Sequence, residues 1–344
     1  MSDTAVAALV IGDAAGIGPE LAARLLAADV WAGTVPMVIG DRRLLEAGAD
    51  HAGLKVALPD ASAAVLAGER PAGPCLIDAR NCDPAVVTPG QGSRATGAAA
   101  LDNFARGLRA CRAGQADFVC FTPFNKHAMR LADPGYVDEI GFIDRTIDAA
   151  ESGREFNVLD EVWNARVTSH IPLRDVVGAL SVERILEGLR LTDRIMRGAG
   201  VATPRIGVAA INPHAGDGGN FGAEDDEIVA PAVARAAREQ IRATGPVPAD
   251  TVFVRAVRGE FDAVLTMFHD QGQIAMKLLG FDRGVTLIAN YPFPIVTPAH
   301  GTAYDIAGRG VADPGATLNA LKLGRKLAGM IRAERMETRT RETA

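Results

Sequence analysis

Short apolar runs recur along the chain, and each is followed by a polar or glycine-rich segment and then by a longer stretch with helical spacing. Apolar runs of about four to eight residues bounded by turn residues are typical of buried strands. Such runs alternate with helical patterns over the whole length, which predicts an α/β fold with mostly parallel strands. The expected strands are 5–11, 35–40, 75–77, 118–121, 162–167, 206–210, 261–266 and 285–289.

Apolar residues at helical spacing occupy most of the segments between these strands. Residues 51–95 are an exception, because several prolines interrupt them and only the short strand at 75–77 is expected there. The expected helices are 21–28, one beginning at Asp41, 96–111, 182–196, 226–244 and 317–335, with a short helical stretch at 304–307.

Three of the six histidines come directly after expected strands. His170 follows the strand at 162–167, His214 follows 206–210, and His269 follows 261–266. Ligands of open α/β sheets bind beyond the carboxyl ends of the strands, and three imidazoles with an open position are a common catalytic metal site. The pattern therefore indicates a metal site. The alternative is that these are ordinary histidines at strand ends.

Two other strand ends carry candidate chemistry. The first strand is followed by a glycine-rich turn at 12–20, which could bind an anion through free N–H groups at the start of a helix. The turn lacks the glycine order of the dinucleotide fingerprint, and the alternative is a tight turn with Pro19 in the first helical turn. Lys126, after the strand at 118–121, is either an exposed cation or a site residue.

Composition narrows the classes of function. With 344 residues the chain can form two domains, and its net charge of −6, with Lys and Arg spread along it, argues against a nucleic-acid binder. The four cysteines show no Cys-x-x-Cys spacing, so we expect reduced thiols in a cytoplasmic protein. Neither a secretory signal nor an apolar run long enough to span a membrane is expected.

Six motifs in a fixed order make the chain resemble the 4-hydroxythreonine-4-phosphate dehydrogenase (PdxA-like) family. The resemblance extends from residue 11 to about residue 327. The motifs are GIGPE at 16–20, SHIPLR at 169–174, NPHAGDGG at 212–219, PADT at 248–251, HDQG at 269–272, and HGTA at 300–303 with DIAGRG at 305–310.

The resemblance implies an architecture. The family has two α/β/α domains with a cleft between them, similar to isocitrate and isopropylmalate dehydrogenases, and its members are homodimers with shared active sites. We expect the first domain at residues 1–125 and 285–344, and the second, with the dimer interface, at 126–284.

The resemblance also implies a reaction, which is NAD-dependent oxidation of a secondary alcohol β to a carboxylate, followed by loss of carbon dioxide. NADP is an alternative cofactor. The metal ligands would be His170, His214 and His269, holding Zn²⁺ or alternatively Mn²⁺, Co²⁺ or Mg²⁺. The candidate acids and bases are Lys126, Asp250 and Asp270, and the expected cofactor contacts are His300, Gly301, Thr302 and Asp305.

The chain departs from the family at the positions that bind the substrate phosphate. The family uses a His-Thr pair, a Lys, an Asn and an Arg, and the corresponding residues here are Glu139, Ile140, Lys277, Thr286 and Ile295. Ile295 donates no hydrogen bond, and Glu139 places a negative charge where the phosphate would lie. We therefore expect a non-phosphorylated substrate such as a cis-dihydrodiol carboxylate. The alternatives are a 4-hydroxythreonine-4-phosphate dehydrogenase that holds its phosphate otherwise, and a non-catalytic binding relative.

Overall fold

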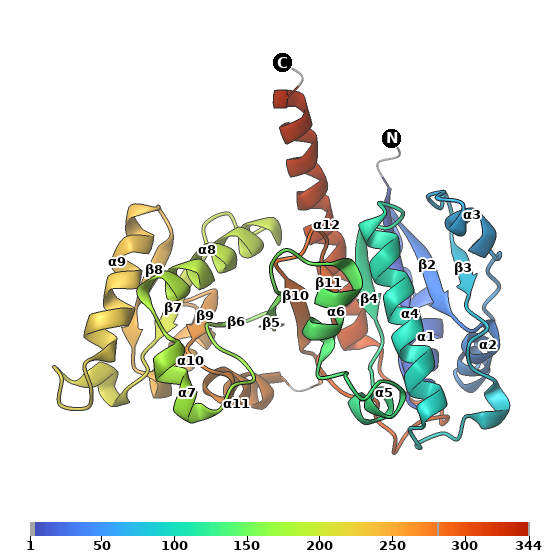
Figure 1. Cartoon of the computed structure of the whole chain (residues 1–344), viewed down its shortest axis with the longest axis horizontal. Coiled ribbons are helices and arrows are strands. Elements are labelled where there is room, and N and C mark those ends of the chain that lie inside the picture. Colours follow the sequence, from blue (N-terminus) through green and yellow to red (C-terminus); the bar gives the residue numbers. More distant parts are fainter. Residues whose placement is uncertain (1–3, 281, 343–344) are drawn as a thin grey trace. The chain divides into compact units, whose positions relative to one another are not determined.

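The computed structural model describes residues 4–280 and 282–342, with side chains up to residue 334. The chain forms a mixed α/β fold in two compact units (Figure 1). Unit 1 contains Met1–Gly153 and Val285–Ala344, and unit 2 contains Arg154–Gly284. None of the helices in the described part of the chain is long and apolar enough to cross a membrane.

Unit 1 is built on a sheet whose neighbouring strands are parallel, apart from the antiparallel pair β10 and β11. The strand order is β3-β2-β1-β4-β11-β10, so β11 is inserted between β4 and β10. The strands are β1 (Ala5–Val10), β2 (Thr34–Gly40), β3 (Cys75–Asp78), β4 (Phe118–Phe121), β10 (Val285–Ala289) and β11 (Ile295–Pro298).

Helices of unit 1 pack around this sheet. They are α1 (Gly18–Ala27), α2 (Arg42–His51), α3 (Ser62–Leu66), α4 (Arg94–Arg112), α5 (Lys126–Ala132), α6 (Glu139–Ile147) and α12 (Gly315–Glu342), with the 3-10 turn η1 (Pro84–Val86). A capping box between Ser93 and Thr96 starts α4, and Phe104 on this helix packs on Phe124 and Phe142. Because α5 and α6 pack against α4, residues 126–153 belong to unit 1 rather than to the second domain expected for them.

The strands of unit 2 lie in the order β5-β6-β9-β7-β8. Its pairs are parallel except for β5 with β6. The strands are β5 (Arg154–Val158), β6 (Trp163–Arg166), β7 (Arg205–Ala209), β8 (Arg242–Val247) and β9 (Ala263–Thr266). The helices are α7 (Leu173–Ala179), α8 (Val182–Gly198), α9 (Ala230–Arg238), α10 (Ala249–Val257) and α11 (His269–Gly280), with the short turns η2 (Pro213–Gly216) and η3 (Asp225–Val229).

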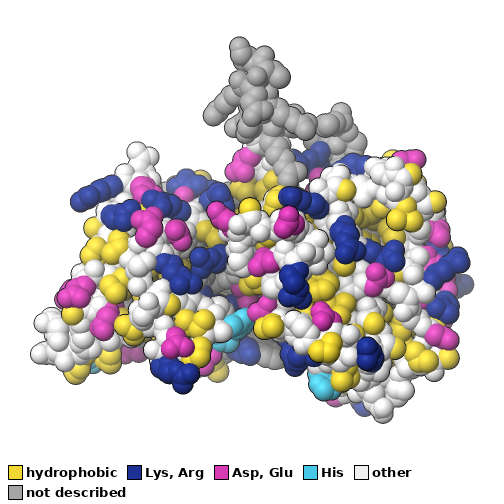
Figure 2. Space-filling view, viewed as in Figure 1, with side chains coloured by type: hydrophobic (Ala, Val, Ile, Leu, Met, Phe, Trp, Pro, Cys, Tyr) yellow, Lys and Arg dark blue, Asp and Glu magenta, His cyan; other side chains and the backbone are white. Residues whose placement is uncertain are grey.

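The prediction of an α/β fold with mostly parallel strands is confirmed, and two expected helices are corrected. The helix expected at 226–244 ends at Arg238, since Gln240 has a φ of 62° and the following residues pair with β7 as β8. The stretch 304–307 forms turns instead of a helix. Figure 2 shows Lys and Arg interspersed with Asp and Glu on the face in view, which agrees with the dispersed charge of the sequence.

Candidate active site

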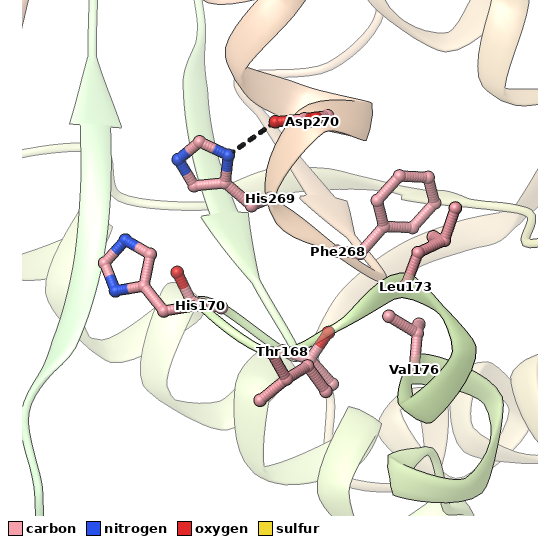
Figure 3. Close-up of a pocket in the computed structure, with 9 residues that line it drawn as sticks. Thr168, His170, Leu173, Val176, Phe268, His269 and Asp270 are labelled. Carbon is pink, nitrogen blue, oxygen red and sulfur yellow. Dashed lines mark hydrogen bonds and ion pairs between the residues drawn. The ribbon is translucent and has the colours of Figure 1, made fainter.

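A pocket of about 260 Å³ in unit 2 brings two of the predicted metal ligands together. His170 lies beyond the end of β6 and His269 begins α11 after β9, and these two strands are parallel neighbours. Their carboxyl ends therefore lie at the same edge of the sheet. The two imidazole ring centroids are 5.5 Å apart, with the rings tilted by 41° (Figure 3).

Asp270 orients the His269 ring. Its Oδ1 lies 2.7 Å from Nδ1 of His269, as the dashed line in Figure 3 shows. This contact assigns the ring proton to Nδ1 in a neutral imidazole and leaves Nε2 as the nitrogen with a lone pair. Histidines that bind metals are commonly held in this way by a carboxylate on the other ring nitrogen. The His269–Asp270 pair is therefore suited to metal binding.

The other side of the pocket is apolar. Phe268, Leu173 and Val176 lie together there, on the side away from the two imidazoles (Figure 3). Leu173 and Val176 belong to α7, which begins inside the motif that contains His170. The sequence interpretation did not single out these two residues, although their nearness to the histidine motif was an available signal.

His214 lies apart from the other two histidines. It is exposed in η2 after β7, and its ring centroid is 6.1 Å from that of Phe221. Within the described residues of this single chain, no group of three His, Cys, Asp or Glu side chains is placed to hold a metal ion. Within one chain, His170 and His269 are thus the two predicted ligands that share this pocket.

The backbone at both histidine loops is unusual. His170 has a φ of 52° and His214 a φ of 53°, in the left-handed region that few residues other than glycine adopt. Such conformations cost of order 1–3 kcal/mol each and cluster at functional sites. The strain at these two positions supports a role for both loops in function.

Two further predicted residues of unit 2 lie outside the pocket. Asp250 is exposed in the first turn of α10, and Lys277 is exposed near the end of α11. Neither residue lines the pocket, whereas Asp270 does.

Lys126 and Glu139 form an ion pair in unit 1. The distance from Lys126 Nζ to Glu139 Oε2 is 2.8 Å, and the two side chains are 47% and 17% exposed. Lys126 is thus exposed, as one interpretation of the sequence expected, but its charge is offset by a carboxylate. Burial and the nearby Glu139 raise the pKa of Tyr136, so its hydroxyl stays protonated beside the pair.

The remaining substrate-binding predictions fall on β10, β11 and α6. Ile140 packs against the core of unit 1, and Thr286 is half-buried in β10. Ile295 has no exposed surface and belongs to the same core, because β11 lies between two other strands. The direct substrate contact expected for Ile295 is therefore corrected, since its side chain is inside the core.

The glycine-rich turn forms a closed structure. Five of its N–H groups donate within the protein, which favours the tight turn over an anion site at these groups. Gly12 N donates to Thr122 Oγ1 at 2.8 Å, Asp13 N to Pro123 O at 3.0 Å, Ala15 N to Asp13 Oδ1 at 3.1 Å, Gly16 N to Asp13 O at 3.1 Å, and Ile17 N to Thr302 O at 3.1 Å.

The expected cofactor contacts lie in the loop between β11 and α12. Gly301 and Asp305 are exposed and His300 is partly exposed, with its Nδ1 3.0 Å from the Gly301 carbonyl oxygen. A Cβ built on Gly301 would meet no atom within 4 Å, so this part of the loop borders open space. The expectation that these residues contact a dinucleotide stays a prediction.

Comparison with known proteins gives a family match over most of the chain. The family model described as "Pyridoxal phosphate biosynthetic protein PdxA" matches residues 33–324. A putative 4-hydroxythreonine-4-phosphate dehydrogenase 2 of Rhizobium meliloti is 53% identical over 329 residues, covering 95% of this chain and 94% of the relative. A D-threonate 4-phosphate dehydrogenase of Cupriavidus necator is 36% identical over 331 residues, covering 94% of this chain and 97% of the relative.

Solved structures agree with this match. A 4-hydroxythreonine-4-phosphate dehydrogenase from Burkholderia phymatum has a TM-score of 0.75 at 34% identity, covering 94% of this chain and 98% of its own. A terephthalate 1,2-cis-dihydrodiol dehydrogenase from Burkholderia xenovorans has a TM-score of 0.66 at 26% identity, covering 95% and 98%. A β-decarboxylating dehydrogenase from Thermococcus kodakarensis shares the fold. Its TM-score is 0.52 at 15% identity, covering 95% of this chain and 84% of its own.

Proposed function

The chain belongs to the PdxA family, and from this premise we propose that it is a metal- and NAD-dependent dehydrogenase of a hydroxy acid. The observation that carries the proposal is the pocket in which His170 and the His269–Asp270 pair lie together. A non-catalytic relative needs no such pair. Bound metal in the purified protein and NADH formation with any hydroxy acid would separate the two possibilities.

The proposed reaction removes a hydride and a proton from the substrate alcohol. The hydride reduces NAD⁺, the proton goes to a base, and the resulting β-keto acid loses carbon dioxide. A divalent ion, when bound, would lower the pKa of the substrate hydroxyl and polarise the ketone. Of the two candidate bases in unit 2, Asp270 lines the pocket, whereas Asp250 does not.

We propose that His214 of a second copy completes the metal site, so that the enzyme is a homodimer. The shared pocket of His170 and His269 supports this proposal, since no described group of three His, Cys, Asp or Glu side chains within one chain is placed to hold a metal ion. Exposed apolar side chains on the elements that carry the pocket residues also favour a partner surface. They are Ile171, Leu173 and Val177 near the His170 motif, and Ile274 and Leu278 on α11.

The preferred substrate in this proposal is a hydroxy acid without a terminal phosphate. A phosphate needs several charge-assisted donors. The Lys126 charge is already offset by Glu139, and Ile295 offers no donor and lies in the core. The similarity to a solved structure named terephthalate cis-dihydrodiol dehydrogenase supports a dihydrodiol carboxylate as the substrate class.

The second candidate is a dehydrogenase of a phosphorylated threonine derivative. The names of the relatives from R. meliloti and C. necator favour it, and so does the exposed Lys277, whose charge is available to an anion. The two candidates differ in one measurable quantity, the ratio of kcat/KM for the two substrate classes.

The test measures kcat/KM by NADH absorbance for a dihydrodiol carboxylate and for 4-phosphohydroxythreonine. We expect the first to exceed the second by about a hundredfold or more, because a charge-assisted hydrogen bond contributes roughly 1.5–3 kcal/mol and several are missing. Efficient turnover of the phosphorylated compound by the natural sequence would overturn the substrate proposal and favour the second candidate.

A variant sharpens this test. Glu139→Gln removes the negative charge and leaves Lys126 available to an anion, so kcat/KM for the phosphorylated compound should rise by about tenfold. Asp102→Asn, which removes a carboxylate paired with Arg106 elsewhere in unit 1, should not change it. Ile295→Arg is unsuitable as a test, since it would bury a charge in the core and lower stability.

A further inference from the structure

The loop between β11 and α12 is docked on the first turn of α1 and on the glycine-rich turn before it. A Cβ on Gly16 would lie 2.8 Å from Thr302 Cβ, so the two segments are in close contact. Beyond the contact of Ile17 with Thr302, the loop is held by Arg24 Nη2 on the Gly310 carbonyl at 2.6 Å and by Ala312 N on Glu20 Oε1 at 2.9 Å.

One side-chain contact joins the middle of this loop to the turn. The Tyr304 hydroxyl donates a short hydrogen bond to Oδ2 of Asp13, a residue 291 positions earlier. Asp13 is only 1% exposed, and its Oδ1 accepts from Ala15 N at 3.1 Å, so the carboxylate is fixed by the turn itself. Burial, followed by the hydrogen bond to Asp13, raises the pKa of Tyr304 and keeps its hydroxyl a donor at neutral pH.

We propose that Tyr304 is a positioning residue, which holds the cofactor-binding loop in place through its hydrogen bond to Asp13. In this proposal the glycine-rich turn supports the loop and does not bind a phosphate. The inference rests on the proposed NAD dependence. Tyr304 lies between Thr302 and Asp305, so a contact that fixes Tyr304 also limits the movement of the residues expected to touch the cofactor. Five N–H groups of the turn meanwhile donate within the protein.

The test compares Tyr304→Phe with the natural protein in NADH binding, measured by fluorescence titration. A phenylalanine keeps the ring and loses the donor, so the Kd for NADH should rise about tenfold. At saturating NAD⁺, kcat should stay within about twofold, because Tyr304 takes no part in the chemistry. Hydrogen exchange of the backbone amides at 300–306 should speed up without cofactor.

Two further variants separate positioning from general stability. Tyr291→Phe removes a matched tyrosine–carboxylate contact, with Asp144, and should leave NADH affinity unchanged even if it lowers the melting temperature. Asp13→Asn keeps an oxygen that accepts from Tyr304 and should bind NADH more tightly than Asp13→Ala does.

The outcomes distinguish this inference from the proposed function. If the natural protein binds NADH and Tyr304→Phe binds it equally well, the positioning role is wrong while NAD dependence stands. If the natural protein binds neither NADH nor NADPH, the proposed function fails and the inference fails with it. If Tyr291→Phe weakens NADH binding as much as Tyr304→Phe does, the effect is one of stability and the inference is again overturned.

Discussion

At single residues, the partner of each charged group decides whether that group is available to a ligand. The Lys126 ammonium is held by Glu139, whereas Asp270 contacts a histidine and leaves the second nitrogen of that ring to a ligand. Ion pairs outside the candidate site contribute instead to the stability of the fold and to the pH dependence of that stability. Asp262 illustrates this in unit 2, where it accepts from Arg205 Nε, Nη2 and backbone N.

Asp262→Asn should lower the free energy of unfolding by roughly 1–2 kcal/mol at neutral pH, since a charge-assisted contact becomes a neutral one. The hydrogen bond from Arg205 holds the pKa of Asp262 below its usual value of 3.8. The contribution is therefore complete above about pH 4 and is lost as the pH falls through the lowered native pKa.

Urea unfolding of the natural protein and of Asp262→Asn at pH 7 and near pH 3 would check this prediction. The difference between them should shrink at the lower pH. Glu260→Gln, in the exposed pair with Arg255, is the control and should change stability little at either pH. An equal difference at both pH values would contradict the prediction.

The sequence could indicate which residues carry chemistry, but not their partners. His170 and His269 were recognisable because each follows an apolar run, and parallel neighbouring strands bring such positions to one edge. No sequence pattern indicates the contact between Asp13 and Tyr304, because the two residues are 291 positions apart and meet only through the tertiary fold. The burial of Ile295 likewise follows from the insertion of β11 between two strands, which its short sequence does not reveal.

Among the elements, α11 has a direct effect on the geometry of the site, because its first residue is His269. Its Gly272 contacts β6 so closely that a Cβ would lie 2.1 Å from Asn164 Oδ1. Asn164 cannot easily move, since its amide donates to Ala165 O, Val264 O and Thr266 Oγ1. A side chain at position 272 would therefore displace the first turn of α11.

Gly272→Ala should lower the free energy of unfolding by about 1–3 kcal/mol through overpacking, and should also weaken metal binding by moving His269 and Asp270. Gly329→Ala on α12 is the control, because its Cβ would meet no atom within 4 Å and alanine favours helix. Urea unfolding and elemental analysis of the metal content would measure both effects. A Gly272→Ala protein with natural stability would show that β6 and α11 adjust freely.

Buried apolar strands are predictable from the sequence, and short helices are not. The strands at 118–121 and 285–289 agree with the structure at both ends, since each is a buried apolar run. The helices α5 and α6, of 7 and 9 residues, were missed because so few turns show little periodicity. The predicted helix at 226–244 wrongly includes residues 242–244 of β8, because the pairing of these residues with β7 decides their conformation.

For the whole molecule, the proposed dimer makes a prediction about mixed variants. If one chain gives His170 and His269 and its partner gives His214, then His214→Ala and His269→Ala should each be inactive alone. A mixed dimer of the two would contain one intact site, so co-expression should restore about a quarter of the natural activity by random pairing.

Co-expression of His170→Ala with His269→Ala is the matched control. Every dimer of that pair would have a defect in each site, so it should stay inactive. Recovery in the control, or an active monomer by light scattering at the assay concentration, would rule out this division of ligands.

The division of unit 1 along the chain has a consequence for synthesis at the ribosome. All strands of unit 2 lie within one continuous segment, Arg154–Gly284, whereas β10 and β11 of unit 1 come after it. Domains generally fold as units while the chain emerges. The part of the sheet formed by β1 to β4 therefore stays incomplete, with the β4 edge unpaired, until the ribosome has made the segment after Gly284. Unit 2, whose synthesis begins after that of unit 1, is thus the first unit whose strands are all synthesised.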